Sequence, residues 1–245
     1  MKYLIKFFVI TTLITFTLSA QAQVKFGIKA GVNLANISQN YEDSDDEINT
    51  KSRLALNLGV TVDYAISEKV SFQSGLSFSG KGFALNLKEP YDGYETEGVK
   101  GYSRLALNYL EIPVNVAYKI KDFQIYAGPY LAVGISGKSK YDYSITYDYG
   151  SESYTFEDEG SYDYKPVFGE VSAADFSDDS EPFRALDYGL NLGVGYDVGP
   201  VVLSLGYSLG LGNITPKYEG STADPSDFKF SNRVLNVSVT YFLGE

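Results

Sequence analysis

The segment YLEIPVNVAYKI at 109–120 alternates strictly between two kinds of residue. Every second residue from Leu110 to Ile120 is apolar or Tyr, whereas the residues between them include Glu111, Asn115 and Lys119. Neighbouring side chains of a β-strand point to opposite faces, so this segment is predicted to be a strand with one oily and one polar face. Seven other segments share the pattern, which predicts an all-β protein with strands at 24–34, 53–66, 70–82, 109–120, 123–136, 186–198, 201–211 and 234–243.

The connections between these strands alternate in length. Those after the second, fourth and sixth strands are two to four residues long, whereas the others span 35–52, 83–106, 137–185 and 212–233. An even number of strands of about 9–11 residues or more, with short turns on one side and long loops on the other, is typical of a transmembrane barrel. We therefore predict an eight-stranded, up-and-down antiparallel transmembrane β-barrel with long extracellular loops and both termini on the periplasmic side. A secreted soluble barrel or sandwich is the alternative.

The first residues have the features of an export signal. Lys2 and Lys6 precede an apolar run at 7–18, and Ala20-Gln21-Ala22 resembles a cleavage site. The run is shorter than the roughly 20 residues of a spanning helix, which argues against a retained anchor. No Cys follows the site, which argues against a lipoprotein. The prediction is a cleaved signal peptide at 1–22, a barrel domain at 23–245, and location in a Gram-negative outer membrane.

The composition argues against several functions. The chain contains no Cys and no His, which removes disulfides, thiolate metal sites and the usual nucleophile–histidine pairs. An acid-only mechanism would need suitably paired carboxylates, and no spacing in the loops indicates them. With 31 acidic and 20 basic residues the formal charge is −11, which disfavours binding to nucleic acid. We therefore expect a non-enzymatic protein without a cofactor or a metal.

Six motifs resemble those of the PorT-like outer-membrane β-barrel family. They are FGIKAGVNLANI (26–37), YLEIPV (109–114), YAGPYLA (126–132), DYGLNLGVGYDV (187–198), YSLGLGNI (207–214) and NRVLNVSVTYF (232–242). The resemblance covers the expected mature chain apart from 35–52, 83–106 and 137–185. It implies an eight-stranded outer-membrane barrel. Most members of that family have no assigned activity, and some take part in protein secretion, but none of these motifs is specific to that role.

The face that should line the barrel carries charges of both signs. An eight-stranded barrel is just wide enough for side chains to fill, and an unpaired buried charge costs several kcal/mol. These residues are therefore expected to pair and to plug the lumen, with Glu111 and Lys29 as the best single pair. An ion or proton pathway is the alternative. The predicted lumen network contains Lys25, Lys29, Arg53, Lys81, Lys119, Asp63, Glu111, Asp187 and Asp197.

Two prolines fall inside predicted central strands. Counted back from the turn at Lys121-Asp122, Pro113 should lie opposite Tyr130 and Pro129 opposite Val114. A closed barrel has no edge at which a missing N–H is harmless, so we expect a bulge or a loosened ladder there. A hinge or lateral opening is the functional alternative.

The connection 137–185 is rich in Tyr and acidic residues. Its first part is predicted to form a protruding hairpin with a turn at Gly150-Ser151. Tyrosine gives rigid contact area at low entropic cost, so this hairpin is a candidate recognition surface. The alternative is a solvated, repulsive surface that divalent ions bridge to lipopolysaccharide. The candidate residues are Tyr141, Tyr143, Tyr147, Tyr149, Tyr154, Tyr162 and Tyr164.

The first long connection holds an acidic cluster at 42–47. It lacks the spacing of a helix-loop-helix calcium site, so no specific Ca²⁺ site is predicted.

These features favour an outer-membrane barrel whose outer loops contact an external partner or maintain the envelope. A small porin or transporter is the second hypothesis, and an accessory barrel in secretion or envelope assembly is the third. The expected partners are outer-membrane lipid, lipopolysaccharide, and an extracellular or secretion-machinery protein.

Overall fold

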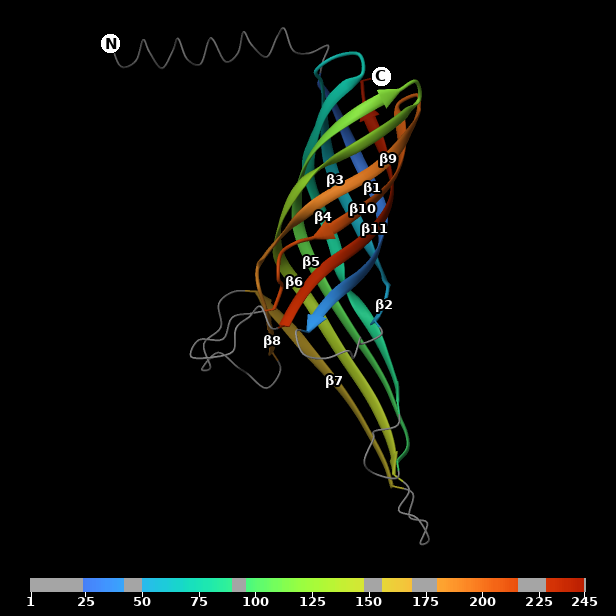
Figure 1. Ribbon diagram of the computed structural model, residues 1–245, viewed down its shortest axis with the longest axis vertical. Coiled ribbons are helices and arrows are strands. Elements are labelled where there is room, and N and C mark those ends of the chain that lie inside the picture. Colours follow the sequence, from blue (N-terminus) through green and yellow to red (C-terminus); the bar gives the residue numbers. More distant parts are fainter. Residues whose placement is uncertain are drawn as a thin grey trace, which may run out of the picture.

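A computed structural model of the protein describes residues 24–41, 50–89, 96–147, 156–168, 180–215 and 228–244. The regular elements of these residues are all strands, and most of them form one large sheet that closes on itself (Figure 1). The strands are β1 (Val24–Tyr41), β2 (Thr50–Lys51), β3 (Arg53–Ala65), β4 (Val70–Glu89), β5 (Thr96–Ile120), β6 (Phe123–Tyr147), β7 (Phe156–Phe168), β8 (Ser180–Phe183), β9 (Leu186–Val198), β10 (Val201–Gly210) and β11 (Phe228–Leu243).

Eight of the strands form a closed antiparallel ring. Its order is β1, β3, β4, β5, β6, β9, β10 and β11, and β11 pairs with β1 again. Phe26 lies opposite Leu243 where the first and last strands meet. The predicted eight-stranded antiparallel barrel is therefore confirmed.

The alternation in the sequence separates an apolar outside from a polar inside. On β3, Leu54, Leu56 and Leu58 are exposed, whereas Ala55 and Asn57 between them are buried. The other ring strands likewise expose their large apolar residues. This arrangement is the reverse of a soluble core and matches the lipid-facing band of a transmembrane barrel.

Three short turns join strands at one end of the barrel, as predicted. The Ser67 hydroxyl accepts hydrogen bonds from the amides of Lys69 and Val70 in the β3–β4 turn. Lys121 and Gly199 hold the other two turns with φ of 56° and 61°. Val24 and Leu243 lie at the same end, where the barrel faces the periplasm according to the short-turn rule.

The structure differs from the prediction at the other end. β4, β5 and β6 continue past the ring, and β6 changes its partner from β9, up to Val133, to β7, from Ser139 onward. We call this continuation, made of residues 80–89, 96–108, 136–147 and 156–165, the sheet extension (Figure 1). The prediction that 83–106 is a loop is therefore wrong for these parts, because strand pairing continues past the membrane-spanning segments. The hairpin predicted in the first part of 137–185 is present as β6 and β7. β11 likewise begins at Phe228 rather than 234.

The two prolines interrupt two different ladders at one height. Pro113 lies opposite Tyr130, as predicted, and the β5–β6 pairing then resumes only at Val116 and Ala127. The β4–β5 ladder also skips a step, between the pairs Ser74–Val114 and Ser77–Glu111. The predicted loosening is thus confirmed.

The strands nevertheless stay in contact at this gap. The Ser74 hydroxyl donates a 2.8 Å hydrogen bond to the Pro113 carbonyl. Gly128 approaches β5 so closely that a Cβ there would collide with the Val114 carbonyl oxygen. This close approach argues against a lateral opening between β5 and β6.

Several predictions fall outside the described residues. They are the signal peptide at 1–22, the acidic cluster at 42–47 and the Gly150-Ser151 turn. In the described part of the chain, no helix is long and apolar enough to cross a bilayer.

Candidate functional site

The barrel lumen contains all nine charged residues predicted to line it. Each lies on the inner side of its strand, and Lys81, Asp63, Glu111 and Asp187 are buried. The charged groups gather in two layers separated by a polar chamber. Above the outer layer, on the extracellular side, lies a cluster of apolar side chains.

The outer layer is an ion triad of Lys81, Glu111 and Asp187. The Lys81 amine lies 2.7 Å from the Glu111 carboxylate and 2.9 Å from that of Asp187. Lys81 and Asp187 are both 0 % exposed. β4, β5 and β9 supply the three residues, so the triad joins strands on different sides of the lumen.

Neutral side chains complete the surroundings of the triad. The Asn232 amide donates a 2.9 Å hydrogen bond to Asp187, and the Tyr130 hydroxyl lies 3.4 Å from the same carboxylate. The Lys81 amine lies 4.2 Å from the centre of the Tyr130 ring and 5.2 Å from that of Tyr109. A cation within about 6 Å of an aromatic face is attracted to it, so Lys81 is held from several sides.

The expected pair of Glu111 with Lys29 is not a direct contact. Glu111 binds Lys81 instead, because β4 lies next to β5 whereas β1 does not. Lys29 still interacts electrostatically with Glu111 across the lumen. One lysine neutralises only one of the two carboxylates in the triad, and Lys29 adds a second positive charge that attracts Glu111.

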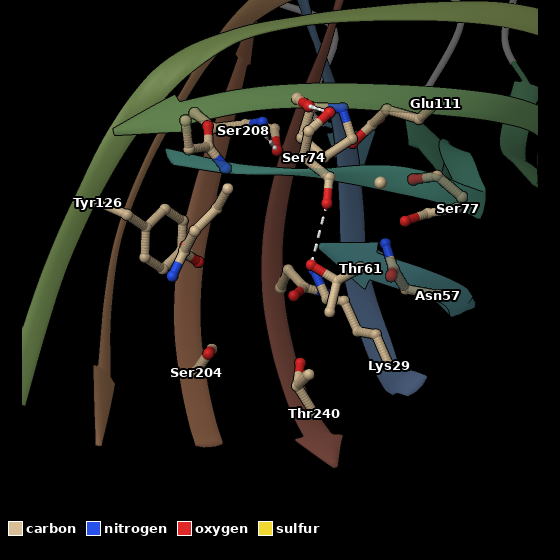
Figure 2. A pocket seen from close by; sticks show the side chains of 18 of the residues that line it. Lys29, Asn57, Thr61, Ser74, Ser77, Glu111, Tyr126, Ser204, Ser208 and Thr240 are labelled. Atoms are coloured by element: carbon tan, nitrogen blue, oxygen red, sulfur yellow. Dashed lines mark hydrogen bonds between the residues drawn. The ribbon is translucent and has the colours of Figure 1, made fainter. Parts of the chain in front are cut away.

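Below the triad lies a polar chamber of about 90 Å³. Figure 2 shows Lys29, Glu111 and several serine side chains from different walls pointing into it. The side-chain oxygens of Asn57 and Asn115 are buried there without a hydrogen-bond partner. A polar cavity of this size holds several water molecules, which would supply those partners.

The periplasmic layer is built around Asp63. It accepts hydrogen bonds from Ser71 at 3.0 Å and from Gln73 at 2.7 Å. Gln73 also donates to Gln124 on β6, which links the two sides of the barrel. Lys119 lies 3.9 Å from Asp63 and is partly exposed, so this ion pair is weaker than the triad.

The remaining predicted charges do not all form ion pairs. Asp197 is attracted electrostatically by Lys119 and Lys25. Arg53 donates a 2.8 Å hydrogen bond to the Lys81 backbone carbonyl rather than pairing with an acid. Arg53 therefore belongs to the rim of the barrel and not to its central network.

An aromatic plug at the outer mouth was not predicted. Phe168 at the end of β7 packs against Gly134 and lies edge-on to Tyr109, with ring centres 5.7 Å apart. Phe183 and Ile214 are buried in the same cluster. No periodic pattern marks these residues, because they come from outside the alternating membrane segments.

Tyr126 fills the lumen beside the chamber. Its ring lies over Gly193 and Gly206, which are opposite each other on β9 and β10. A Cβ on either glycine would collide with the ring. These two small residues therefore create the space that the tyrosine occupies.

The candidate recognition tyrosines fall on the sheet extension where the structure describes them. Tyr141 lies opposite Tyr162, and Ser139 opposite Tyr164. Tyr143 and Tyr147 follow on β6, and Tyr149 and Tyr154 lie outside the described residues. The predicted β6–β7 pairing is therefore present, whereas a recognition role stays a prediction.

The described residues contain no group of three or more His, Cys, Asp or Glu side chains placed to hold a metal. The arrangement is instead a closed lumen: charge pairs in two layers, a hydrated chamber between them, and an aromatic plug outside.

Ring closure, an outward apolar band and a polar interior define an outer-membrane β-barrel protein. The chain belongs to the family described as "Outer membrane protein beta-barrel domain", which it matches over residues 19–215. This membership indicates an outer-membrane location. No curated protein matches the chain.

Solved structures similar to the chain include Ail, the attachment invasion locus protein of Yersinia pestis. It is 12% identical to this chain, the match covers 89% of this chain and 99% of Ail, and the TM-score is 0.35. Neisserial surface protein A has 16% identity, coverage of 88% and 96%, and a TM-score of 0.31. The outer membrane protein OprG from Pseudomonas aeruginosa has 12% identity, coverage of 91% and 97%, and a TM-score of 0.36.

Proposed function

We propose that this protein is a non-conducting, non-enzymatic outer-membrane barrel that carries a rigid β-sheet beyond the membrane as an interaction surface. The observation that supports the proposal most directly is the lumen. The ion triad and the aromatic plug are stacked across it, and both draw residues from strands on different sides.

The sheet extension supports the second half of the proposal. Four strands continue well past the last lipid-facing residues, and they remain paired to each other. Such length serves no need of the membrane span, for which about 9–11 residues suffice. A paired sheet presents contact residues with less entropy to lose than an irregular loop.

Two other functions also have support. The resemblance to PorT-like barrels supports an accessory role in secretion or envelope assembly as one form of the interaction. The polar chamber favours a small pore or transporter as the second candidate function, because it already provides hydrated space in the middle of the lumen.

Single-channel recording of the refolded protein in planar bilayers separates these functions. We expect no steady conductance from the wild-type chain. A trimmed chain, in which a two-residue Asn-Gly turn joins the register partners Ser139 and Tyr164, keeps Phe168 and Phe183 and should also be silent. Steady conductance of the wild-type chain would overturn the closed-barrel proposal and favour the pore.

The interaction role needs a separate measurement on intact cells. Tyr102 is exposed near the base of the sheet extension, and a photocrosslinking residue placed there should give a covalent adduct with an external or envelope component. The same residue at Tyr207, in the lipid-facing band, is the control. The absence of any adduct specific to Tyr102 would count against the interaction surface.

A further inference from the structure

The ion triad holds an amine and a carboxyl group in position to react with each other. The Lys81 amine lies 2.9 Å from Oδ2 of Asp187, and the carbon of that carboxylate is one bond further away, within roughly 4 Å of the amine. A near-attack distance of about 3–3.5 Å is therefore a small shift away. Groups held together in this way react with effective concentrations of about 10⁵–10⁸ M. Lys81 and Asp187 are thus placed to condense to an amide.

Glu111 is placed to act as the base of such a reaction. Its carboxylate lies 2.7 Å from the same amine, closer than that of Asp187. An ammonium group is not a nucleophile, so Lys81 must lose a proton before it can attack. General acid–base catalysis requires a carboxyl group within hydrogen-bond reach of that proton. Because two carboxylates surround one amine, Glu111 can take the proton while Asp187 remains beside the nucleophile.

Two neutral donors polarise the Asp187 carboxylate. The Asn232 amide donates a 2.9 Å hydrogen bond to Oδ2, and the Tyr130 hydroxyl lies 3.4 Å from both oxygens. Both side chains are buried. Buried donors at an oxygen stabilise the negative charge that develops there when its carbon is attacked. The site therefore has a nucleophile, an electrophile, a base and donors for the oxyanion.

The surroundings of the triad favour an uncharged product. The rings of Tyr109 and Tyr130 flank the amine, and the apolar cluster closes the outer side. Burial of a charge costs free energy even when the charge is paired. Condensation would replace one buried cation and one buried anion by a neutral amide. The water that forms has a place to go, because Glu111 also lines the polar chamber below.

The periplasmic layer lacks this arrangement. Lys119 lies 3.9 Å from Asp63, and its side chain is 26% exposed. The distance is longer than in the triad, and the amine is in contact with water, which stabilises its charged form. Condensation is therefore expected at the triad and not at this second pair.

We propose that Lys81 and Asp187 form an isopeptide bond once the barrel has folded. Glu111 takes a proton from the Lys81 ammonium, and Nζ then attacks Cγ of Asp187. Glu111 passes the two protons that the nitrogen loses to one oxygen of Asp187, and the bond between Cγ and that oxygen breaks as water leaves. Atoms and charges balance without an oxidant, a reductant or a cofactor, and Glu111 returns to its starting state.

The bond would join β4 to β9, which are not neighbours in the ring. The ion triad is the state of the site before condensation. The reaction takes place once in each chain, so it agrees with a non-enzymatic function. It depends neither on a closed lumen nor on an interaction surface outside the membrane.

Mass spectrometry of the full chain, purified from outer membranes and then denatured, tests the bond. Condensation should lower the mass of the wild-type chain by that of one water molecule. Digestion should then release a pair of linked peptides whose tandem spectra join Lys81 to Asp187. This localisation separates the bond from any other loss of mass. After boiling, the wild-type chain still contains a covalent loop between residues 106 positions apart, which alters its mobility on a denaturing gel.

Three variants test the chemistry. Glu111→Gln keeps the size of the base but removes its ability to take a proton, so the bond should form about 10²–10⁴-fold more slowly. Lys81→Arg keeps the positive charge but lacks the primary amine and should give no linked peptides. Lys119→Arg makes the same exchange in the periplasmic layer and should leave the bond intact. The heat-dependent gel mobility of each variant before boiling shows whether its barrel is folded.

The wild-type chain alone can overturn the proposal. Folded wild-type protein without the linked peptides would do so, and this result does not depend on whether any variant folds. A bond from Lys81 to Glu111 would also overturn it, because the base and the electrophile would then be exchanged. Linked peptides in equal amounts in the Glu111→Gln chain would contradict the role of Glu111. A conducting wild-type channel would contradict the closed lumen but leave this result unaffected.

Discussion

Lys81 and Asp187 are 106 residues apart in the sequence, and the Lys81 amine lies 2.9 Å from the Asp187 carboxylate in the outer layer of the lumen. β4 and β9, which carry them, are not neighbours in the ring. The ion pair therefore crosses the barrel rather than running along its wall. Together with Glu111 it ties three strands to one buried amine.

Removal of Lys81 should destabilise the barrel strongly. Lys81→Met leaves two buried carboxylates without their cation, and loss of one partner of a buried pair typically costs about 3–5 kcal/mol. Urea unfolding of the protein in lipid, followed by circular dichroism, measures the free energy of unfolding. Glu111→Ala should lower the free energy of unfolding by less, because Lys81 keeps its ion pair with Asp187.

Lys119→Met is the control for that experiment. Its partner Asp63 is 3.9 Å away and the lysine is partly exposed, so the change should cost less than about 1 kcal/mol. A similar loss in both variants would show that the buried triad has no special role in stability.

The packing of Tyr126 against two glycines predicts a coupled pair of substitutions. Gly206→Ala should destabilise by about 1–3 kcal/mol, because its methyl group collides with the Tyr126 hydroxyl and with no backbone atom. The same change combined with Tyr126→Ala should cost almost nothing beyond Tyr126→Ala alone. A double-mutant cycle of unfolding free energies measures this coupling.

Ser204→Ala, also at the chamber, serves as the control for this cycle. It should show little coupling to Tyr126. Additive effects of Gly206→Ala and Tyr126→Ala would contradict the proposed packing.

The gap in the β5–β6 ladder should be visible in hydrogen exchange. The amides of residues 114–115 and 128, between the two resumed pairings and next to the hydrated chamber, should exchange faster than those of 116–118. Mass spectrometry of the protein in lipid nanodiscs after deuterium labelling resolves these segments. Uniform protection along β5 would show that the ladder is intact.

The aromatic plug and the ion triad should each block the lumen by themselves. Phe168→Ser opens the aromatic plug but leaves the ion triad beneath it, so this variant should still be silent in planar bilayers. Phe168→Ser combined with Lys81→Ser and Asp187→Ser should give current bursts. If Phe168→Ser alone conducts steadily, the triad does not close the lumen.

The alternation of the sequence predicts the membrane part of the fold well because a period of two allows only two assignments. Leu54, Leu56 and Leu58 either all face lipid or all face the lumen, and only the first suits a barrel. The short turns then determine which strands are neighbours. Counting residues back from the Lys121-Asp122 turn, for example, correctly predicted that Pro113 lies opposite Tyr130.

The contents of the lumen could not be predicted in the same way. Alternation shows that Lys29, Lys81 and Glu111 face inward, but not how far each strand is shifted along its neighbour. That shift decides which charges lie at the same height in the lumen. As a result Glu111 forms its ion pair with Lys81 and not with Lys29. The aromatic plug had no apolar period to mark it, and of the strands past the membrane only the β6–β7 hairpin was predicted.

The change of partner along β6 has a mechanical consequence. Inside the membrane β6 is bonded to β9, and outside it to β7, while its pairing with β5 runs through both regions. A pull on the far end of the sheet extension is thus transmitted along the strands into the barrel wall. Such a pull loads many backbone hydrogen bonds in shear at once instead of unzipping them singly. A protein built this way is suited to hold a tether under tension.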